Sequence, residues 1–562
     1  MPRRLWLSLG MLVAGVSLLV VAGLASPAQS GTNAQVKNGG TYKLATTTDL
    51  DSIDPQIAYG TLSWWIEWST GVRLLSYPDA AAPRGTRLFP EGAKAFPKIS
   101  HGGRTYTFTI RPGFKFSNGA KVTAKNYAYA INRALNKDLN SPAAQFIDGD
   151  LGVPIVGAKA VNSGQAQTAS GVKTNGNRLI IQLEKPDPTF LARISLIFFQ
   201  ATSLNLPIDK EIITVHNKDD LPTAGPYYVS FREPNRTIII KKNPNYKKGA
   251  GRTRPRHLNE VDINVGVSEE AGYRQVLANQ VDEGPIPAPE VANVRNQFGV
   301  NKSRFWVKPR VCVSYLALNT SPGHLFAGNV PLRKAVNYAI RRQAMVDQGG
   351  VLAGQPWDHV LPPGMPGANL NTHVYPLKTP NLAKAKKLAK GHTKNGKAVY
   401  YFFNNSVSAV GRKEINRADL ANIGITMEEK GFRGFALYTA AGKKGSDHDI
   451  TQAGWCQDYP DPSDFVNILL FGGSIQPDNN NNLAYFNSAK YNAKMNAAAK
   501  KVGKARLSTY GKLDLDIIKN QAPWASFQVP TNRYLFSNRV NSKCLIYQGV
   551  LQDFNITNLC LK

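Results

Sequence analysis

The stretch FTIRPGFKFSNGAKVTAKNYAYAINRAL, residues 108–135, contains a strand, a turn and a helix in succession. Polar and apolar residues alternate over residues 105–110, which predicts a half-buried strand that ends at the turn Arg111-Pro112-Gly113. Thr123 can then cap a helix whose apolar residues recur on one face. The segment therefore indicates a fold that mixes helices with strands.

The same alternation of strand and helix patterns continues along the chain. Strands are predicted over residues 179–183, 237–240, 311–319 and 398–403. Pro331 and the pair Asp461-Pro462 suit helix starts. Four lysines, Lys384, Lys386, Lys387 and Lys390, are expected on the solvent face of a short helix. These patterns predict an α/β protein.

Length and composition exclude several classes of protein. The chain has 562 residues, which is enough for more than one domain. Hydrophobic residues make up 42% and charged residues 19%, which is typical of a folded globular chain and not of a disordered one. The net charge of +30 fits nucleic acid, acidic membranes, anionic wall polymers or acidic ligands. The densest basic run, residues 241–256, is interpreted as a solvated loop.

The N-terminus predicts export. Arg3 and Arg4 precede the apolar run of residues 5–24, and small residues follow over 25–30. We interpret residues 1–30 as an export signal, although the apolar run is also long enough for an uncleaved anchor. The expected location is the periplasm or the outer face of the cytoplasmic membrane or cell wall, which argues against nucleic acid. The first cysteine is Cys312, so a lipid anchor on a signal-proximal cysteine is not expected.

The four cysteines form an even set in a chain predicted to be exported. Two disulfides are therefore expected, and three connectivities are possible. Cys544 and Cys560 lie only 16 residues apart and are natural partners, which leaves Cys312 with Cys456. The chain has no CxxC pattern, so zinc ligation has little support.

The sequence lacks the common catalytic and metal-binding patterns. The chain contains neither GxSxG nor HExxH. Residues 391–398 imitate a P-loop but lack its Ser or Thr, and a strand is predicted where a helix should follow. Asp447-His448-Asp449 is interpreted as a solvated loop, and residues 478–482 lack the spacing of a calcium loop. No enzymatic activity, cofactor or metal is therefore predicted.

A series of short segments occurs in a fixed order between Lys37 and the C-terminus. They are Gly39-Gly40-Thr41, Leu50-Asp51-Ser52-Ile53-Asp54-Pro55, residues 108–119 and 122–133, Ala224-Gly225-Pro226-Tyr227, Lys242-Asn243-Pro244-Asn245-Tyr246, Leu318-Asn319-Thr320, Leu332-Arg333-Lys334-Ala335-Val336, Leu361-Pro362-Pro363-Gly364 and residues 454–462 (GWCQDYPDP). Together they resemble the extracytoplasmic solute-binding proteins of family 5, the peptide/nickel class of receptors for ABC importers. Arg341-Arg342 and Lys125-Asn126 depart from the family's acidic pattern, and these residues are expected at the surface.

The resemblance implies two lobes joined by a hinge, as in the periplasmic binding proteins of class C. The first lobe would comprise residues 31–74, an inserted subdomain over 75–202, residues 203–311 and the C-terminal segment 525–562. The second lobe would comprise residues 312–524. In the oligopeptide-binding branch, a disulfide joins the positions that match Cys312 and Cys456.

The resemblance also implies a function and a site. The protein would bind oligopeptides or dipeptides in a cleft between the lobes and deliver them, as a monomer, to a membrane permease. Asp458 would meet the peptide ammonium, helped by the dipole of a helix that starts just after it, and Trp455 would form a wall of the cleft. The peptide backbone would pair with two segments, Tyr59-Gly60-Thr61 and Ala453-Gly454-Trp455-Cys456.

Other functions fit the same sequence. The solute could be a metal chelate, an opine or an oligosaccharide, because a fold does not fix its cargo. The protein could instead be an exported enzyme on the same scaffold, or a surface protein that grips anionic wall polymer through its charge.

Overall fold

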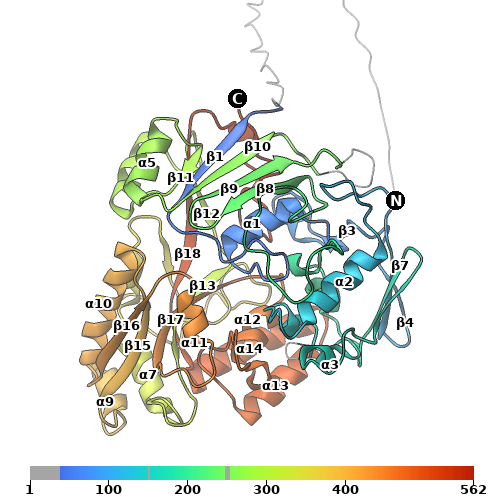
Figure 1. The fold of residues 1–562 in the computed structure, drawn as a ribbon. Coiled ribbons are helices and arrows are strands. Elements are labelled where there is room, and N and C mark those ends of the chain that lie inside the picture. Colours follow the sequence, from blue (N-terminus) through green and yellow to red (C-terminus); the bar gives the residue numbers. More distant parts are fainter. Residues whose placement is uncertain (1–37, 150–151, 247–253) are drawn as a thin grey trace, which may run out of the picture. The chain divides into compact units, whose positions relative to one another are not determined.

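The computed structural model describes residues 38–149, 152–246 and 254–562 (Figure 1). The predicted export signal lies outside the described residues. No helix in the described part of the chain is both long and apolar enough to cross a membrane. Strands and helices are mixed throughout, which confirms the predicted α/β class.

The first lobe is built on strands drawn at the top of Figure 1. Strand β1 lies between β10 and β11 and is parallel to both, while β9 and β8 extend the sheet in antiparallel fashion. The elements of this lobe are β1 (Thr41–Thr46), α1 (Thr61–Thr70), β8 (Tyr227–Glu233), β9 (Thr237–Lys242), β10 (Glu260–Val265), α5 (Glu269–Leu277), β11 (Glu283–Gly284), α6 (Val291–Phe298) and β12 (Phe305–Pro309).

Residues 75–202 contribute separate small sheets and helix α2. A four-stranded sheet has the order β4-β5-β7-β6, and β2 pairs with β3. The elements are β2 (Leu75–Ser76), β3 (Phe89–Pro90), β4 (Lys98–Ser100), β5 (Thr105–Thr109), α2 (Ala124–Leu135), α3 (Ala158–Asn162), β6 (Val172–Asn175), β7 (Arg178–Gln182) and α4 (Phe190–Arg193). The strand, turn and helix predicted from residues 105–135 are therefore confirmed, and Asn126 Oδ1 accepts a 2.9 Å hydrogen bond from the Thr123 N–H at the start of α2.

The second lobe has the strand order β16-β15-β17-β13, with helices on both sides. Its elements are β13 (Cys312–Leu318), α7 (Val330–Ala339), α8 (Arg342–Asp347), β14 (Gly354–Pro356), α9 (Leu382–Ala389), β15 (Lys397–Phe403), α10 (Val407–Ala421), β16 (Thr426–Phe432), α11 (Ala436–Ala441), β17 (Ile450–Cys456), α12 (Ser463–Leu470), α13 (Ala489–Ala499) and α14 (Gly503–Asn520). The helices predicted at Pro331 and after Asp461-Pro462 are confirmed as α7 and α12.

One long strand, β18 (Trp524–Phe536), belongs to both lobes. Its first part pairs with β13, from Trp524 to Gln528. Its last part pairs with β12 and β11, where Leu535 lies opposite Phe305 and Gly284. Trp524, the expected last residue of the second lobe, is the first residue of this strand, and residues 525–528 also pair with β13.

Two departures from the family pattern are not at the surface, contrary to expectation. Asn126 is buried and donates to the Thr202 carbonyl oxygen at 2.9 Å. Arg342 is fully buried, and its guanidinium donates to the carbonyl oxygens of Ser526 at 2.7 Å and Asn337 at 2.8 Å. Burial lowers the pKa of Arg342 to about 10. A guanidinium group has five N–H donors in one plane, so it can donate to several carbonyl oxygens at once. This is why Arg342 can be buried.

Candidate ligand-binding site

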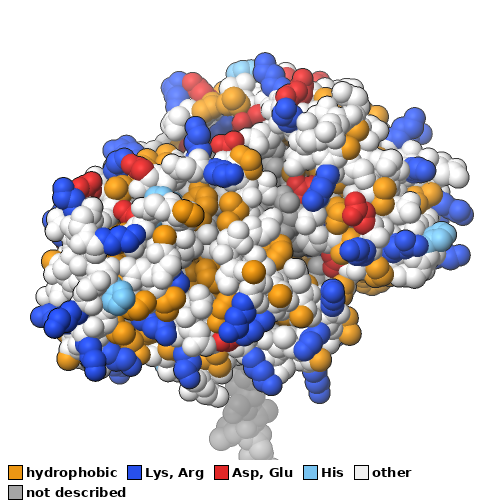
Figure 2. All heavy atoms as spheres, turned by 90° about the horizontal axis from the view of Figure 1, so that it is seen from below, with side chains coloured by type: hydrophobic (Ala, Val, Ile, Leu, Met, Phe, Trp, Pro, Cys, Tyr) orange, Lys and Arg blue, Asp and Glu red, His pale blue; other side chains and the backbone are white. Residues whose placement is uncertain are grey.

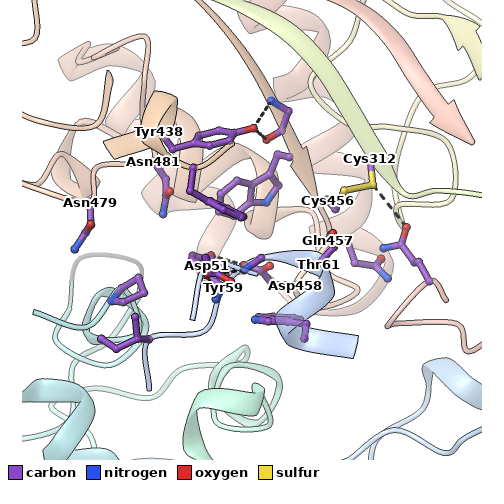
Figure 3. Close-up of a pocket in the computed structure, with 18 of the residues that line it drawn as sticks. Asp51, Tyr59, Thr61, Cys312, Tyr438, Cys456, Gln457, Asp458, Asn479 and Asn481 are labelled. Atoms are coloured by element: carbon purple, nitrogen blue, oxygen red, sulfur yellow. Dashed lines mark hydrogen bonds between the residues drawn. A yellow bond between two sulfur atoms is a disulfide. The ribbon is translucent and has the colours of Figure 1, made fainter. Parts of the chain in front are cut away.

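A cavity of about 710 Å³ lies between the two lobes (Figure 3). Residues from both lobes line it, and they include most of the residues predicted from the sequence: Tyr59, Gly60, Thr61, Gly454, Trp455, Cys456 and Asp458. Ala453, which was also predicted, packs in the hydrophobic core and does not line the cavity. Segments that lie almost 400 residues apart in the sequence thus meet at one place.

Asp458 and Tyr59 contact each other across this cavity. The Tyr59 hydroxyl donates to Asp458 Oδ2 at 2.7 Å, and the Asp458 side chain is almost completely buried. No Lys, Arg or His of the described chain forms an ion pair with Asp458. A carboxyl group buried without a cation is costly when ionised, so this group is suited to receive a cation.

Burial raises the pKa of Asp458 to about 7, although the Tyr59 hydrogen bond partly opposes this. Asp464, in the first turn of α12, lies close by, and its Oδ2 accepts the Asp458 N–H at 2.8 Å. Burial and the charge of Asp458 raise the pKa of Asp464 as well. Burial therefore opposes the help expected from the helix dipole, and α12 begins only at Ser463.

The turn that carries Tyr59 is fixed by Asp51. Asp51 Oδ2 accepts from the N–H groups of Tyr59 at 2.6 Å and Gly60 at 2.8 Å, and Asp51 Oδ1 accepts from the Ser63 hydroxyl. A Cβ atom on Gly60 would lie 2.7 Å from a ring carbon of Phe435 in the second lobe. A larger residue at position 60 would therefore displace the Phe435 ring or the Asp51 carboxylate.

A buried ion pair holds the segment just before this turn. Arg133 of α2 binds both carboxylate oxygens of Asp54, with Nη2 at 2.6 Å from Oδ2, and neither side chain is exposed. Arg133 Nη1 also donates to Gln56 Oε1 at 2.7 Å. A bidentate, fully hydrogen-bonded pair is rigid, so it anchors the 51–60 segment on α2.

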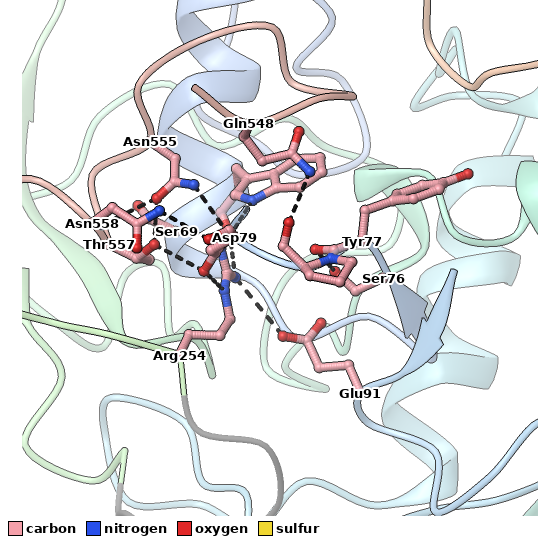
Figure 4. A network of polar contacts seen from close by, with 12 residues as sticks. Ser69, Ser76, Tyr77, Asp79, Glu91, Arg254, Gln548, Asn555, Thr557 and Asn558 are labelled. Atoms are coloured by element: carbon pink, nitrogen blue, oxygen red, sulfur yellow. Dashed lines mark hydrogen bonds and ion pairs between the residues drawn. The ribbon is translucent and has the colours of Figure 1, made fainter. Parts of the chain in front are cut away.

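Helix α1, which starts at the cavity, is anchored at its other end by Arg254 (Figure 4). Arg254 forms a bidentate pair with Asp79, at 2.7 and 3.0 Å, and also donates to the Trp68 carbonyl of α1. The Trp68 indole N–H donates to the same Asp79 at 2.8 Å. Arg254 is buried, so the interpretation of the whole basic run as a solvated loop is wrong at this residue.

The opposite wall of the cavity is formed by strands β13 and β17, which are covalently joined. Cys312 and Cys456 lie directly opposite each other in the antiparallel pair and form a disulfide with a Cα–Cα distance of 4.0 Å. Cys544 and Cys560 form a second disulfide. The structure therefore has the pairing expected from spacing and resemblance, and the first disulfide fixes the end of β17 two residues before Asp458.

Trp455 and Tyr438 present polar groups at this wall. The Trp455 ring lies edge-on to Tyr59, with centroids 5.7 Å apart, and its buried indole N–H has no hydrogen-bond partner among the described residues. The Tyr438 hydroxyl accepts the Gly454 N–H at 3.1 Å and donates to the Gly454 carbonyl at 3.2 Å. The Tyr438 hydroxyl thus forms hydrogen bonds with both the N–H and the carbonyl of Gly454.

Several residues that line the cavity were missed by sequence reasoning. Arg310 lies between β12 and β13, and it is the one Lys or Arg among the described residues of the lining. The polar run at Asn479 to Asn481, considered only as a calcium loop, bridges the lobes: Asn479 Nδ2 donates to the Asn140 carbonyl and Asn481 Nδ2 donates to Gln145 Oε1, each at 3.2 Å. The run of asparagines that follows the predicted ligand segment was the sequence feature that could have indicated these contacts.

Two clusters could suggest a metal ion, and neither is built as a metal site. Lys430 donates to Asp447, and the Leu325 N–H donates to Asp449. The His448 ring bonds to Ser446 of its own loop and donates to the Leu483 carbonyl oxygen. A second cluster comprises Asp358, His359 and His373. Both ring nitrogens of His359 already have oxygen partners, Asp514 Oδ2 at 2.9 Å and the Thr372 carbonyl oxygen at 2.6 Å.

Comparison with known proteins agrees with this architecture. A sequence model of the bacterial extracellular solute-binding proteins, family 5, matches residues 87–477. The chain is 27% identical over 444 residues to heme-binding protein A of Haemophilus influenzae, covering 76% of each chain. It is 26% identical to oligopeptide-binding protein OppA of Bacillus subtilis, covering 67% of this chain and 69% of that protein.

Solved structures show the same fold. The periplasmic binding protein DppA from Helicobacter pylori, in complex with the peptide STSA, superposes with a TM-score of 0.76 at 20% identity, covering 93% of this chain and 98% of that one. The murein tripeptide binding protein MppA of Escherichia coli superposes with a TM-score of 0.77 at 21% identity, covering 94% and 99%. The family match, the two lobes and the cavity between them agree, and the chain belongs to family 5 of the bacterial extracellular solute-binding proteins.

Proposed function

We propose that this protein is the solute-binding component of an ABC importer and that it binds peptides through their free amino terminus. The observation that carries the proposal is Asp458, a buried carboxyl group that faces the interlobe cavity without a basic partner in the described chain. Relatives whose names state oligopeptide or dipeptide binding support this class of ligand.

The peptide ammonium would take the place of the Tyr59 hydroxyl on Asp458. A charge-assisted N–H···O bond in a cavity closed to water is stronger than the neutral bond that it replaces. The Trp455 ring packs against Tyr59, so it would lie near the same cation. The unpartnered Trp455 N–H would donate to the first carbonyl of the peptide.

The peptide backbone would add to the free edge of β17. Strand β15 pairs with β17 only at Ile450 and Thr451, and further along β17 Gly454, Trp455 and Cys456 line the cavity. The Tyr438 hydroxyl now makes the two hydrogen bonds at Gly454 that a residue of an added antiparallel strand would make. Main-chain pairing of this kind is independent of side-chain identity, which suits a receptor for many sequences.

Arg310 would hold the carboxylate end of the peptide. Its Nε is buried and has no hydrogen-bond partner among the described residues, and it forms no ion pair in the described chain. An unsatisfied guanidinium in a cavity is costly, whereas a bidentate carboxylate would satisfy it. The cavity would then bind both the ammonium and the carboxylate of a short peptide.

The role of this protein would be binding and delivery, without chemical change of the solute. We propose that it acts as a monomer, outside the cytoplasm, and hands its ligand to membrane permease subunits. No lipid anchor on a signal-proximal cysteine is part of the proposal, and neither nucleic acid nor a cofactor is required.

Mass spectrometry of the ligand that is released when the purified protein is denatured tests the proposal. Co-purified peptides with free amino termini are the expected result, and calorimetry should show that N-acetylation of the same peptide abolishes binding. Heme, detected by its absorbance, or a chelate, opine or oligosaccharide in place of peptides would overturn the choice of ligand.

A further inference from the structure

The tip of the α13–α14 helical pair combines exposed lysines with an exposed apolar side chain. Residues 500–504 read Lys-Lys-Val-Gly-Lys, and Lys500, Lys501 and Lys504 are all exposed. Val502 stands between them with 64% of its surface exposed, among the highest values for a large apolar side chain in the described chain. This tip shares no residue with the lining of the interlobe cavity.

The sequence on either side of the tip lacks acidic residues. Residues 479–513 contain seven Lys or Arg and no Asp or Glu. Lys504 and Lys512 lie eight residues apart on α14, which places them on one helix face, and Lys490 is exposed on α13. Lys494 and Arg506 are paired, with Asp516 and Asp461, but the exposed lysines at the tip form no ion pair with described residues.

Figure 2 looks onto the side of the molecule where α13 and α14 lie in Figure 1. Lys and Arg side chains are spread over this face and acidic side chains are few. Helix α9 adds exposed Lys384, Lys386 and Lys387, and residues 359–413 also contain no Asp or Glu. The second lobe thus carries several exposed lysines outside the cavity.

The position of Val502 among lysines allows a choice between two kinds of anionic partner, a soluble polyanion and a phospholipid bilayer. A soluble polyanion would pair with the lysines but would leave Val502 in water. The boundary of a phospholipid bilayer accepts both groups, because the apolar side chain enters the acyl region while the lysine ammonium groups reach the phosphates. We propose that the tip of the α13–α14 pair docks on an anionic phospholipid surface, which would hold the receptor next to the membrane.

Flotation of the full chain with lipid vesicles tests this proposal. Vesicles of phosphatidylcholine mixed with phosphatidylglycerol should carry the protein, and vesicles of phosphatidylcholine alone should not. Binding should fall at least about tenfold between low salt and about 0.5 M NaCl, because surface charges are then screened. Equal binding to both kinds of vesicle would contradict the proposal.

Matched variants identify the tip as the contact. The triple variant K500Q/K501Q/K504Q should lower vesicle affinity at least about tenfold, and V502S about three- to fivefold. The control K98Q/K121Q/K125Q removes three exposed charges from residues 75–202 and should have little effect. All variants should keep the wild-type melting temperature and peptide affinity, which separates this test from that of the proposed function.

Two outcomes would overturn the assignment. If the control variant weakens binding as much as the tip variant, the net charge alone is responsible. If V502S binds vesicles like the wild type while soluble polyphosphate competes with them fully, the basic face is a site for an anionic polymer.

Discussion

Asp54 and Asp458 are two acids in recognisable sequence segments, and the structure gives them opposite surroundings. Asp54 is neutralised by Arg133, which lies 79 residues further along the chain. Asp458 has a tyrosine hydroxyl as partner and no basic side chain in the described residues. The sequence could identify both as members of motifs. It could not tell a structural acid from a binding acid, because that difference depends on which long-range partner folds against each one.

The first prediction concerns Asp458 directly. Asp458→Asn should lower peptide affinity by about 10- to 100-fold, since a buried charge-assisted hydrogen bond contributes about 1.5–3 kcal/mol. Calorimetry with one peptide measures the change. Glu211→Gln, which changes another acid of the cavity lining, serves as the matched control and should alter affinity less than about threefold. An Asp458→Asn protein with wild-type affinity would rule out this anchor.

The second prediction follows from the raised pKa of Asp458. An ammonium ligand needs the ionised carboxylate, so affinity should rise with pH, by up to about tenfold per unit below the pKa of about 7. In the ligand-free protein the sign is opposite: this group makes the free energy of unfolding fall as pH rises from its ordinary value toward 7. Calorimetry between about pH 5 and pH 8 tests the first effect, and Asp458→Asn should show a flatter profile.

At the scale of elements, the strands and helices that the sequence predicted lie within a residue or two of the observed ones. Period-two and helical spacing are local properties, so residues 105–135 could be interpreted without knowing the fold. Burial of polar residues could not be predicted in this way. Arg254, Arg342 and Asn126 lie in polar or basic stretches, yet each is buried because distant carbonyl or carboxylate groups surround it. The Gly454 edge was predicted as a pairing site, but its present partner, Tyr438, was not.

The third prediction concerns the disulfide between β13 and β17. Cys312 and Cys456 close a loop of 144 residues, whereas Cys544 and Cys560 close one of 16. In the chain-entropy description, loss of the long-range disulfide should lower the free energy of unfolding by about 5 kcal/mol, and loss of the short one by about 3 kcal/mol. Chemical denaturation of the two double Cys→Ser variants measures both values. A larger loss from the short loop would show that native packing, and not loop closure, sets the effect.

At the scale of the whole molecule, polar contacts around the cavity join the two lobes, and one buried hydrophobic cluster contains residues of both. Tyr59 bonds to Asp458, and Asn479 and Asn481 reach Asn140 and Gln145. Two lobes and a cleft were expected only from the resemblance, because no local pattern reports how distant segments face each other. The pairing of residues 525–528 with β13 shows the same limit, since a lobe boundary depends on sheet partners.

The fourth prediction concerns closure of the lobes. Tyr59→Phe removes a hydrogen bond between the lobes, so the ligand-free variant should populate more open forms and show a larger radius of gyration by small-angle X-ray scattering. Saturation with peptide should bring the variant and the wild type to the same value. A variant that stays larger when saturated would mean that Tyr59 is needed for closure itself.

Strand β18 has a mechanical consequence at the point where it passes from one lobe to the other. There Pro309 lies opposite Thr531, Pro530 lies opposite Gly354, and a Cβ on Gly354 would come within 2.1 Å of the Val529 carbonyl oxygen. Prolines offer no N–H to the ladder, so Pro309 and Pro530 cannot donate a backbone hydrogen bond here. At such a point the two lobes can rotate relative to each other while each keeps its own structure. Arg310 follows Pro309 directly, so the position of a carboxylate bound to Arg310 would change with the angle between the lobes.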